Sequence, residues 1–106
     1  MGTTKSTNQI FFCGITKNCI NQIQSNLNFI ENFLIETKFK TNIIFVDSDS
    51  TDGTKNSLSL FSNKHRNVFY IDLDGLENQY SNRIERILLS RNKCLEIMDS
   101  IKVAEN

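Results

Sequence analysis

An acidic, hydroxyl-rich segment follows the most apolar run of the chain. Val46 to Thr54 reads Val-Asp-Ser-Asp-Ser-Thr-Asp-Gly-Thr and comes directly after Ile43-Ile44-Phe45. This pattern predicts a buried strand that ends in a polar loop, and in open α/β sheets such strand-end loops line the ligand crevice. Asp47, Ser48 and Asp49 have the oxygen atoms to hydrogen-bond the base and ribose edges of a nucleotide. The same residue types are also common in ordinary turns, which is the alternative interpretation.

A cationic segment, Arg83 to Lys93, supplies the opposite charge. Arg83 is expected in the first turn of a helix, close to the strand ends, where its guanidinium can pair with phosphates or stack on a base. Arg91 falls between Leu88 and Leu95 on the apolar stripe expected for that helix. A buried arginine there needs a carboxylate or a ligand phosphate as its partner. A structural salt bridge, or a side chain that reaches solvent, is the alternative.

Two Asp-x-Asp triplets offer oxygen ligands for a divalent cation. They are Asp47-Ser-Asp49 and Asp72-Leu-Asp74, and each follows a predicted strand. Paired carboxylates at a strand end can hold Mg²⁺ or Mn²⁺, although the triplet alone is a weak signal. The glycine-rich phosphate loops of dinucleotide-binding proteins and P-loop NTPases are absent from the sequence.

The elements that must position these residues alternate between strand and helix. Three strands are expected, at Gln9–Cys13, Asn42–Asp47 and Val68–Asp72. The first helix begins after a cap at Asn18, and the second after a cap at Thr51 or Asp52. The third runs from Asn82 to about Ile101 and is expected to bury the stripe Ile84, Ile87, Leu88, Leu95, Met98 and Ile101. This order predicts an α/β fold, with a three-layer, Rossmann-like parallel sheet of βαβαβα order.

Composition narrows the classes of partner. The chain has 106 residues, with 12 Lys and Arg against 12 Asp and Glu, so its formal charge is zero. Neither a nucleic acid nor an anionic membrane is therefore expected as a partner. Residues 1–9 form a polar tail without the apolar core of a signal peptide, and no apolar run is long enough to span a bilayer. Reduced cysteines, with Cys13 and Cys94 on core faces, and a cytoplasmic location are expected.

Together these segments resemble the N-terminal half of a GT-A glycosyltransferase. Val46 to Thr54 resembles the Val-Asp/Glu-x-x-Ser-x-Asp-Gly-Thr loop of that superfamily, and Phe12 to Asn18 is similar to the first strand and turn of family-two enzymes. The run from Arg83 to Leu95 is similar to a helix of cryptococcal capsule α-mannosyltransferase-like enzymes. The resemblance covers about Ile10 to Met98, and the combination of motifs is more specific than any one of them.

The resemblance implies a role for each matching position. Asp47 would bind the base of a UDP- or GDP-linked sugar, and Ser48 and Asp49 would flank the base and ribose. Ile15 and Thr16 would contact the nucleotide from the first-strand turn. Further contacts would come from Arg83 or Arg86, near the base and diphosphate, and from Arg91 and Asn92, which secure the third helix against the donor site.

The chain departs from the family pattern near its end. In the family the metal-binding Asp-x-Asp follows a fourth strand, whereas Asp72-Leu-Asp74 follows the third. We therefore expect a half-domain, residues 10–106, truncated before the fourth strand, which binds nucleotide weakly and transfers no sugar by itself. The complete enzyme would use Mn²⁺ or Mg²⁺ to move a sugar to an acceptor that the sequence does not identify. A homo-oligomer or a separate C-terminal partner chain is also expected.

A second interpretation comes from a different class of protein. Flavodoxin-like receiver modules also place acidic residues at the ends of parallel strands, and Asp72 stands where such a module carries its phosphorylated aspartate. Receiver modules also need a lysine after a fifth strand, and no fifth strand is expected in this sequence. Under this interpretation the chain is a signalling or interaction module without catalytic activity.

Overall fold

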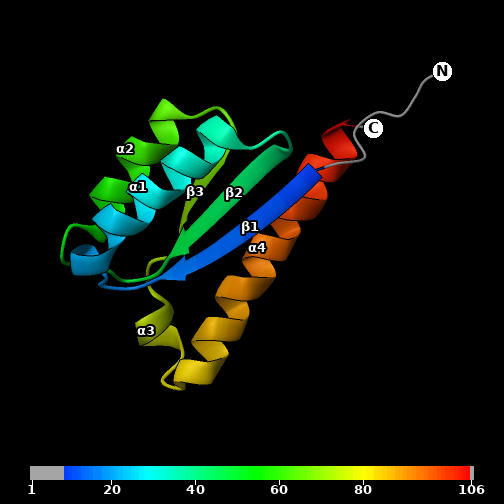
Figure 1. The fold of residues 1–106 in the computed structure, drawn as a ribbon. Helices are drawn as coiled ribbons and strands as arrows, with labels where there is room; N and C mark the ends of the chain where they lie inside the picture. The colour runs from blue at the N-terminus through cyan, green and yellow to red at the C-terminus, as the bar shows by residue number, and fades with distance from the viewer. Residues whose placement is uncertain (1–8, 106) are drawn as a thin grey trace.

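A computed structural model describes residues 9–105, which form a three-stranded parallel sheet with helices on both faces (Figure 1). The strands are β1 (Gln9–Thr16), β2 (Lys40–Asp47) and β3 (Val68–Asp72), and they lie in the order β1-β2-β3. The helices are α1 (Ile20–Glu36), α2 (Thr54–Lys64), the short α3 (Leu76–Gln79) and α4 (Arg83–Glu105). The predicted α/β alternation and parallel sheet are confirmed. Of the predicted polar tail, residues 1–8 lie outside the described residues, and Gln9 opens β1.

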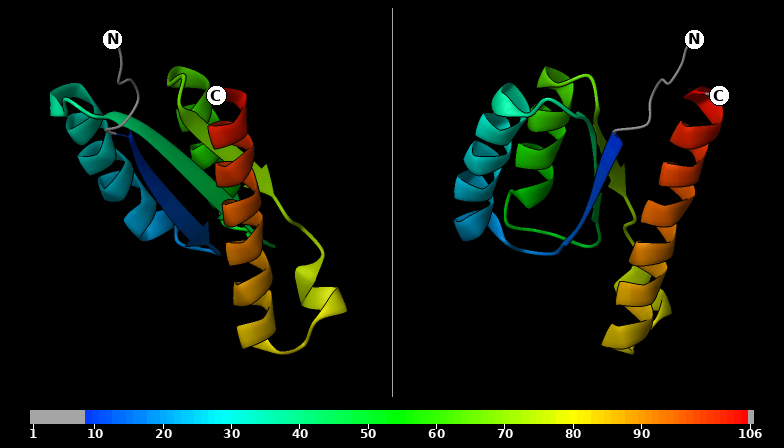
Figure 2. Two further views of the ribbon diagram at one scale, coloured as in Figure 1. Left: turned by 90° about the vertical axis from the view of Figure 1, so that its right-hand side faces the viewer. Right: turned by 45° about the vertical axis from the view of Figure 1, so that its right-hand side comes forward.

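The sheet separates two layers of helices, as Figure 2 shows: α1 and α2 cover one face and α4 covers the other. Alternate residues of the central strand point to opposite faces of the sheet, because side chains alternate along a strand. Ile43 and Phe45 pack toward α1 and α2. Ile44 and Val46 pack toward α4, where they meet Cys94. The core thus lies on both sides of β2, whose residues 41 to 47 are all buried.

Helix α1 follows the sequence pattern closely. The spacing of Ile20, Ile23, Leu27, Ile30 and Leu34 by three and four residues predicts one apolar stripe. Ile23 and Leu27 are buried and the other three pack beside them, so the stripe is confirmed. The start of the helix differs from expectation, because its N-cap residue is Cys19 and has no side-chain cap. Asn18 instead adopts a left-handed backbone conformation with φ 48°. Its side chain bonds to the next loop rather than to α1.

The strands match their predicted positions, with one extension that matters for the site. β3 spans Val68–Asp72 as expected, whereas β1 continues beyond Cys13 to Thr16. Its pairing with β2 stays in register through the partners Thr16 and Asp47. Continued parallel pairing therefore brings the two strand ends side by side.

The predicted buried stripe of α4 is wrong over most of its length. Met98 and Ile101 pack against the sheet, whereas Ile84, Ile87, Leu88 and Leu95 are exposed. Small residues, Ser90 and Cys94, face the sheet instead and are both 1% exposed. The first turns of α4 also extend past the strand ends, where no strand lies beneath them (Figure 1). Within residues 9–105, no helix has an apolar stretch long enough to cross a lipid bilayer.

Candidate functional site

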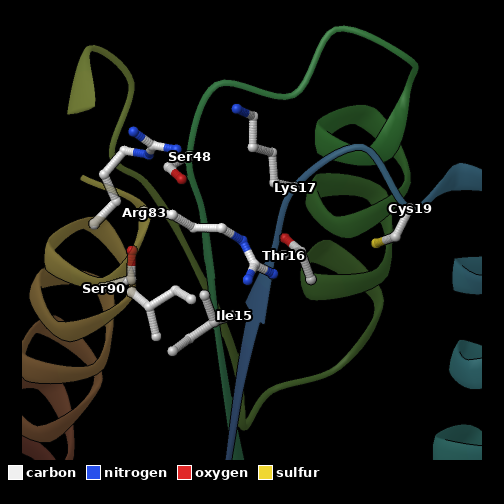
Figure 3. A pocket seen from close by; sticks show the side chains of 9 residues that line it. Ile15, Thr16, Lys17, Cys19, Ser48, Arg83 and Ser90 are labelled. Carbon is white, nitrogen blue, oxygen red and sulfur yellow. The ribbon is translucent and has the colours of Figure 1, made fainter. Parts of the chain in front are cut away.

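A pocket of about 560 Å³ lies between the carboxyl end of β1 and the first turns of α4 (Figure 3). Its lining residues are Ile15, Thr16, Lys17, Cys19, Ser48, Arg83, Arg86, Ile87 and Ser90. Five of the nine residues predicted from the sequence are among them: Ile15, Thr16, Ser48, Arg83 and Arg86. Parallel strands end at one edge of the sheet, which is why β1 and β2 residues meet there.

Three cationic side chains line this pocket, and they differ in their ion-pair and hydrogen-bond partners. Lys17 forms an ion pair with Glu77. Arg86 donates from Nη1 to the carbonyl oxygens of Tyr80 at 2.8 Å and Ser81 at 2.9 Å. Arg83 is exposed and has neither a hydrogen bond nor an ion pair within residues 9–105. The pocket therefore contains one guanidinium that is available to an anionic ligand.

A hydrogen-bond network lies behind Thr16, outside the lining of the pocket. Asp47 Oδ1 accepts from Thr16 Oγ1 at 2.7 Å and from Ser50 Oγ at 2.6 Å. Ser50 Oγ in turn accepts from the backbone N–H of Asn18 at 2.8 Å. The side-chain oxygen of Asn18 accepts from the N–H of Thr51 at 2.8 Å. Backbone and side-chain bonds thus join the loop after β1 to the loop after β2.

Asp47 is the centre of this network and does not line the pocket. Its side chain is 0% exposed, and the hydroxyl of Thr16 bonds to it from the pocket side. Its second oxygen, Oδ2, has no hydrogen-bond donor among the described residues. A buried carboxylate oxygen without a donor is energetically costly, so this atom could accept a bond from a ligand. The predicted contact between Asp47 and a base stays a prediction.

Asp49 has a local structural role. Its backbone is left-handed, with φ 60°. Its carboxylate accepts from the N–H groups of Gly75 at 2.8 Å and Glu77 at 3.0 Å, at the start of α3. Asp49 is therefore engaged with the loop after β3 and does not line the pocket.

Arg91 and Asn92 lie outside the pocket, on exposed positions of α4. The predicted burial of Arg91 is wrong, because α4 turns Ser90 and Cys94 toward the sheet instead. Arg91 then lies on a flank of the helix that faces solvent. Its predicted association with a donor nucleotide is not tested by this geometry.

Four lining residues were not predicted: Lys17, Cys19, Ile87 and Ser90. Lys17 directly follows Thr16, so an extended first strand would have suggested it. Ser90 is a small polar residue that directly follows Ile87-Leu88-Leu89, and a small residue at this place permits close approach to the sheet. Cys19 has a raised pKa, mainly because of burial, while a hydrogen bond with Thr54 acts in the opposite direction.

The second Asp-x-Asp triplet already has a cationic partner. Lys55 of α2 pairs with Asp72 at 3.2 Å and also with Asp74. The hydrogen bond from Lys55 is the largest cause of the lowered pKa of Asp74. Among residues 9–105, no three His, Cys, Asp or Glu side chains are grouped so that they could hold a metal ion.

Comparisons of this chain with protein-family models, with curated proteins and with solved structures find no significant match. What the pocket can bind is therefore inferred from its own residues.

Proposed function

We propose that the chain binds the nucleotide part of a UDP- or GDP-linked sugar, as the donor-binding half of a GT-A glycosyltransferase. The main support is Arg83, an unpartnered guanidinium within the described residues that lines a pocket at the strand ends. Arg86 and Lys17 add positive charge around the same volume. Guanidinium groups bind phosphate oxygens in a planar, bidentate manner, so a diphosphate is the anion that this wall favours.

The rest of the lining suits the uncharged parts of a nucleotide. The hydroxyls of Ser48 and Ser90 can donate to or accept from ribose and base edges, and that of Thr16, whose proton is donated to Asp47, can accept. Ile15 and Ile87 offer apolar surface for one face of a ring. The volume of about 560 Å³ falls in the roughly 300–1,000 Å³ range of small-molecule sites. Binding that displaces the Thr16 hydroxyl would let a base N–H donate to Oδ1 of Asp47, the oxygen to which Thr16 now donates.

The classification of this α/β sheet as a GT-A fold is part of the same proposal. Under this proposal the three described strands are the first three of a GT-A sheet, and the family's metal-binding Asp-x-Asp follows a fourth strand. In the complete enzyme Mn²⁺ or Mg²⁺ would neutralise the leaving diphosphate. The described residues present no suitable ligand group, so we assign no metal ion and no reaction step to residues 9–105.

Isothermal titration with UDP, GDP and pyrophosphate tests the proposal. We expect Arg83→Ala to weaken UDP or GDP binding about tenfold or more, because a hydrogen bond to a charged group contributes ~1.5–3 kcal/mol. Arg91→Ala is the matched control, since it removes the same side chain from an exposed position of the same helix outside the pocket.

Three results would oppose the proposal. One is no nucleotide binding by the wild-type chain at millimolar ligand. Another is an equal effect of the two arginine variants. Binding of pyrophosphate as tight as that of UDP and GDP would point to a plain anion site without recognition of the nucleoside.

A further inference from the structure

Strand β1 is an edge strand without the usual protection against pairing. Among the described strands it pairs with β2 alone. Its eight residues, Gln-Ile-Phe-Phe-Cys-Gly-Ile-Thr, include no charge and no proline, and their pairing with β2 has no bulge. Natural edge strands are usually shortened, charged, bulged or covered to prevent association. The opposite edge strand, β3, has only five residues and ends at Asp72, which pairs with Lys55.

The backbone of β1 presents hydrogen-bonding groups outward at alternate residues. The carbonyl of Thr16 faces β2, because it accepts from the N–H of Ser48 at 3.2 Å. Successive residues of a strand point their N–H and C=O groups to opposite sides. The groups of Phe11, Cys13 and Ile15 therefore point away from β2, to the side where no described strand lies.

Apolar surface borders this edge on the α1 face of the sheet. A groove of about 490 Å³ is lined there by side chains and backbone of β1, α1 and β2. Phe12 and Phe33 meet edge to face in it, with ring centroids 5.7 Å apart. Phe12 is 47% exposed and Phe29 is 72% exposed. Large aromatic side chains so exposed at a groove are typical of an interaction surface.

Apolar surface also borders the edge on the α4 face. Lys102 lies over the ring of Phe11, with Nζ 5.5 Å from the ring centroid, which places this flank of α4 on the β1 side. Leu95, Leu88 and Ile84 lie seven, fourteen and eighteen residues before Lys102, and this helical spacing puts them on the same flank. All three are at least 49% exposed. The unpaired edge thus lies between two apolar strips.

We propose that this edge pairs with the β1 edge of a second copy of the chain. The two strands run antiparallel about a twofold axis perpendicular to the sheet, and they join two three-stranded sheets into one of six. That axis keeps each helix layer on its own face, so α1 meets α1 of the copy and α4 meets α4. Such an isologous contact is self-complementary, because each apolar strip meets its own counterpart.

Area and charge favour a second copy as the occupant. A fully exposed large side chain presents about 200 Å², so the exposed parts of these apolar side chains amount to on the order of 600 Å² per protomer. Standard interfaces bury about 800 Å² per partner, a value that the two backbone edges help to reach. A chain with a formal net charge of zero has no net charge to repel its own copy. Arg91 lies between Leu88 and Leu95 on the same flank of α4, and its long, exposed side chain can extend from the apolar strip to solvent.

Sedimentation velocity over a concentration series of the full chain tests this association. We expect the weight-average mass to rise from 12.2 kDa toward twice that value. Phe12→Lys should abolish the rise by placing a charge at the edge. Phe39→Lys is the matched control, because Phe39 is also 47% exposed but lies outside β1 and its groove. A wild-type chain that stays monomeric, an equal loss in both variants, or growth beyond a dimer would overturn the proposal.

Amide hydrogen exchange on the wild-type chain gives a second test that needs no variant. The amides of Phe11, Cys13 and Ile15 should gain protection as the concentration rises, whereas those of Phe12 and Gly14 should be protected throughout. Concentration-independent exchange at the first three would overturn the proposal. The Phe12→Lys variant leaves the lining of the nucleotide site unchanged, because Phe12 does not line that pocket. A monomer that binds UDP would contradict only the dimer, and a dimer that binds no nucleotide only the proposed function.

Discussion

Cys13 and Cys94 interact where β1 meets α4, yet their chemistry differs sharply. Cys94 is 1% exposed, and its pKa is raised to about 12, first by burial and then by the nearby Cys13. Cys13 is exposed at the edge of the sheet, so its predicted place on a core face is wrong. An edge strand leaves one side uncovered, and the sequence alone did not show that β1 is such a strand.

This difference predicts selective alkylation. With iodoacetamide at about pH 8, and with the chain dilute enough to be monomeric, the exposed Cys13 should react. Cys94 should not, because it is buried and its raised pKa leaves little of the thiolate, which is the reacting species. Denaturation in urea should make Cys94 react as well. Peptide mass spectrometry gives the extent at each site, and comparable labelling of Cys13 and Cys94 in the folded chain would contradict the assignment.

Individual site residues were predictable where a polar side chain follows an apolar run. Ser48, which lines the pocket, was predicted in this way, and Arg83 from its place in the first turn of a helix, whereas Ile15 and Thr16 came only from the family resemblance. Arg91 shows the limit of the approach. The apolar residues of α4 occupy both the buried face and an exposed flank, so their spacing does not fix the rotation of the helix. Burial of an arginine cannot be inferred from spacing in that case.

At the scale of elements, the lack of a side chain at Gly14 leaves room beside β1 for the ring of Phe45 in β2. A Cβ atom at this position would come within 2.9 Å of Phe45 Cδ1. We expect Gly14→Ala to lower the free energy of unfolding by about 1–3 kcal/mol, the usual cost of overpacking. Urea denaturation measures the loss.

A double variant tests the cause of that loss. In Gly14→Ala with Phe45→Leu the smaller side chain relieves the contact, so the combined loss should be less than the sum of the single losses. Strictly additive losses would show that the ring of Phe45 is not responsible.

Asp52 joins the starts of two helices. Its carboxylate accepts from the N–H of Ile20 at 3.0 Å, in α1, and from Thr54 Oγ1 at 2.6 Å and N at 3.1 Å, in α2. The bond from the Thr54 hydroxyl is the main reason that the pKa of Asp52 is lowered below the usual 3.8. One side chain thereby serves both N-termini, where negative charge is also favoured by the helix dipoles.

The lowered pKa of Asp52 predicts a pH dependence with a definite sign. Its contribution to stability is complete above the unfolded value of 3.8 and is lost as the pH falls through the lower folded value. Between about pH 5 and 3, the wild-type chain should therefore lose more stability than Asp52→Asn. Urea titrations at several pH values give the comparison. Asp99→Asn, at an exposed position of α4, should follow the wild-type curve; parallel curves for wild type and Asp52→Asn would refute the prediction.

Elements were easier to predict than their ends. Apolar periodicity located α1, and a short apolar run located β3 to the residue. The start of α1 was assigned to a cap by Asn18, but the donors there bond to Asp52 and Thr54, more than thirty residues away in the chain. Tertiary hydrogen bonds of this kind leave no local pattern in the sequence.

At the scale of the whole molecule, the two edges of the sheet differ. Its α/β class and parallel pairing followed from the alternation of elements, because crossovers between successive strands permit few arrangements. The order β1-β2-β3 places the longest unprotected strand at one edge and a short strand at the other. Edge position depends on which strands pair, so the exposure of β1 and of the α4 flank could not be predicted from composition or periodicity.

The bonds that join Asn18, Ser50 and Asp47 also bear on how fast a ligand could enter. They order the loops behind the pocket before any ligand arrives, so little conformational entropy is lost in these loops on binding. Diffusion into a positively charged opening would then limit the association rate. Differences in affinity among anions would then come from their dissociation rates. Contacts with α4, which lines one side of the pocket, would determine those rates.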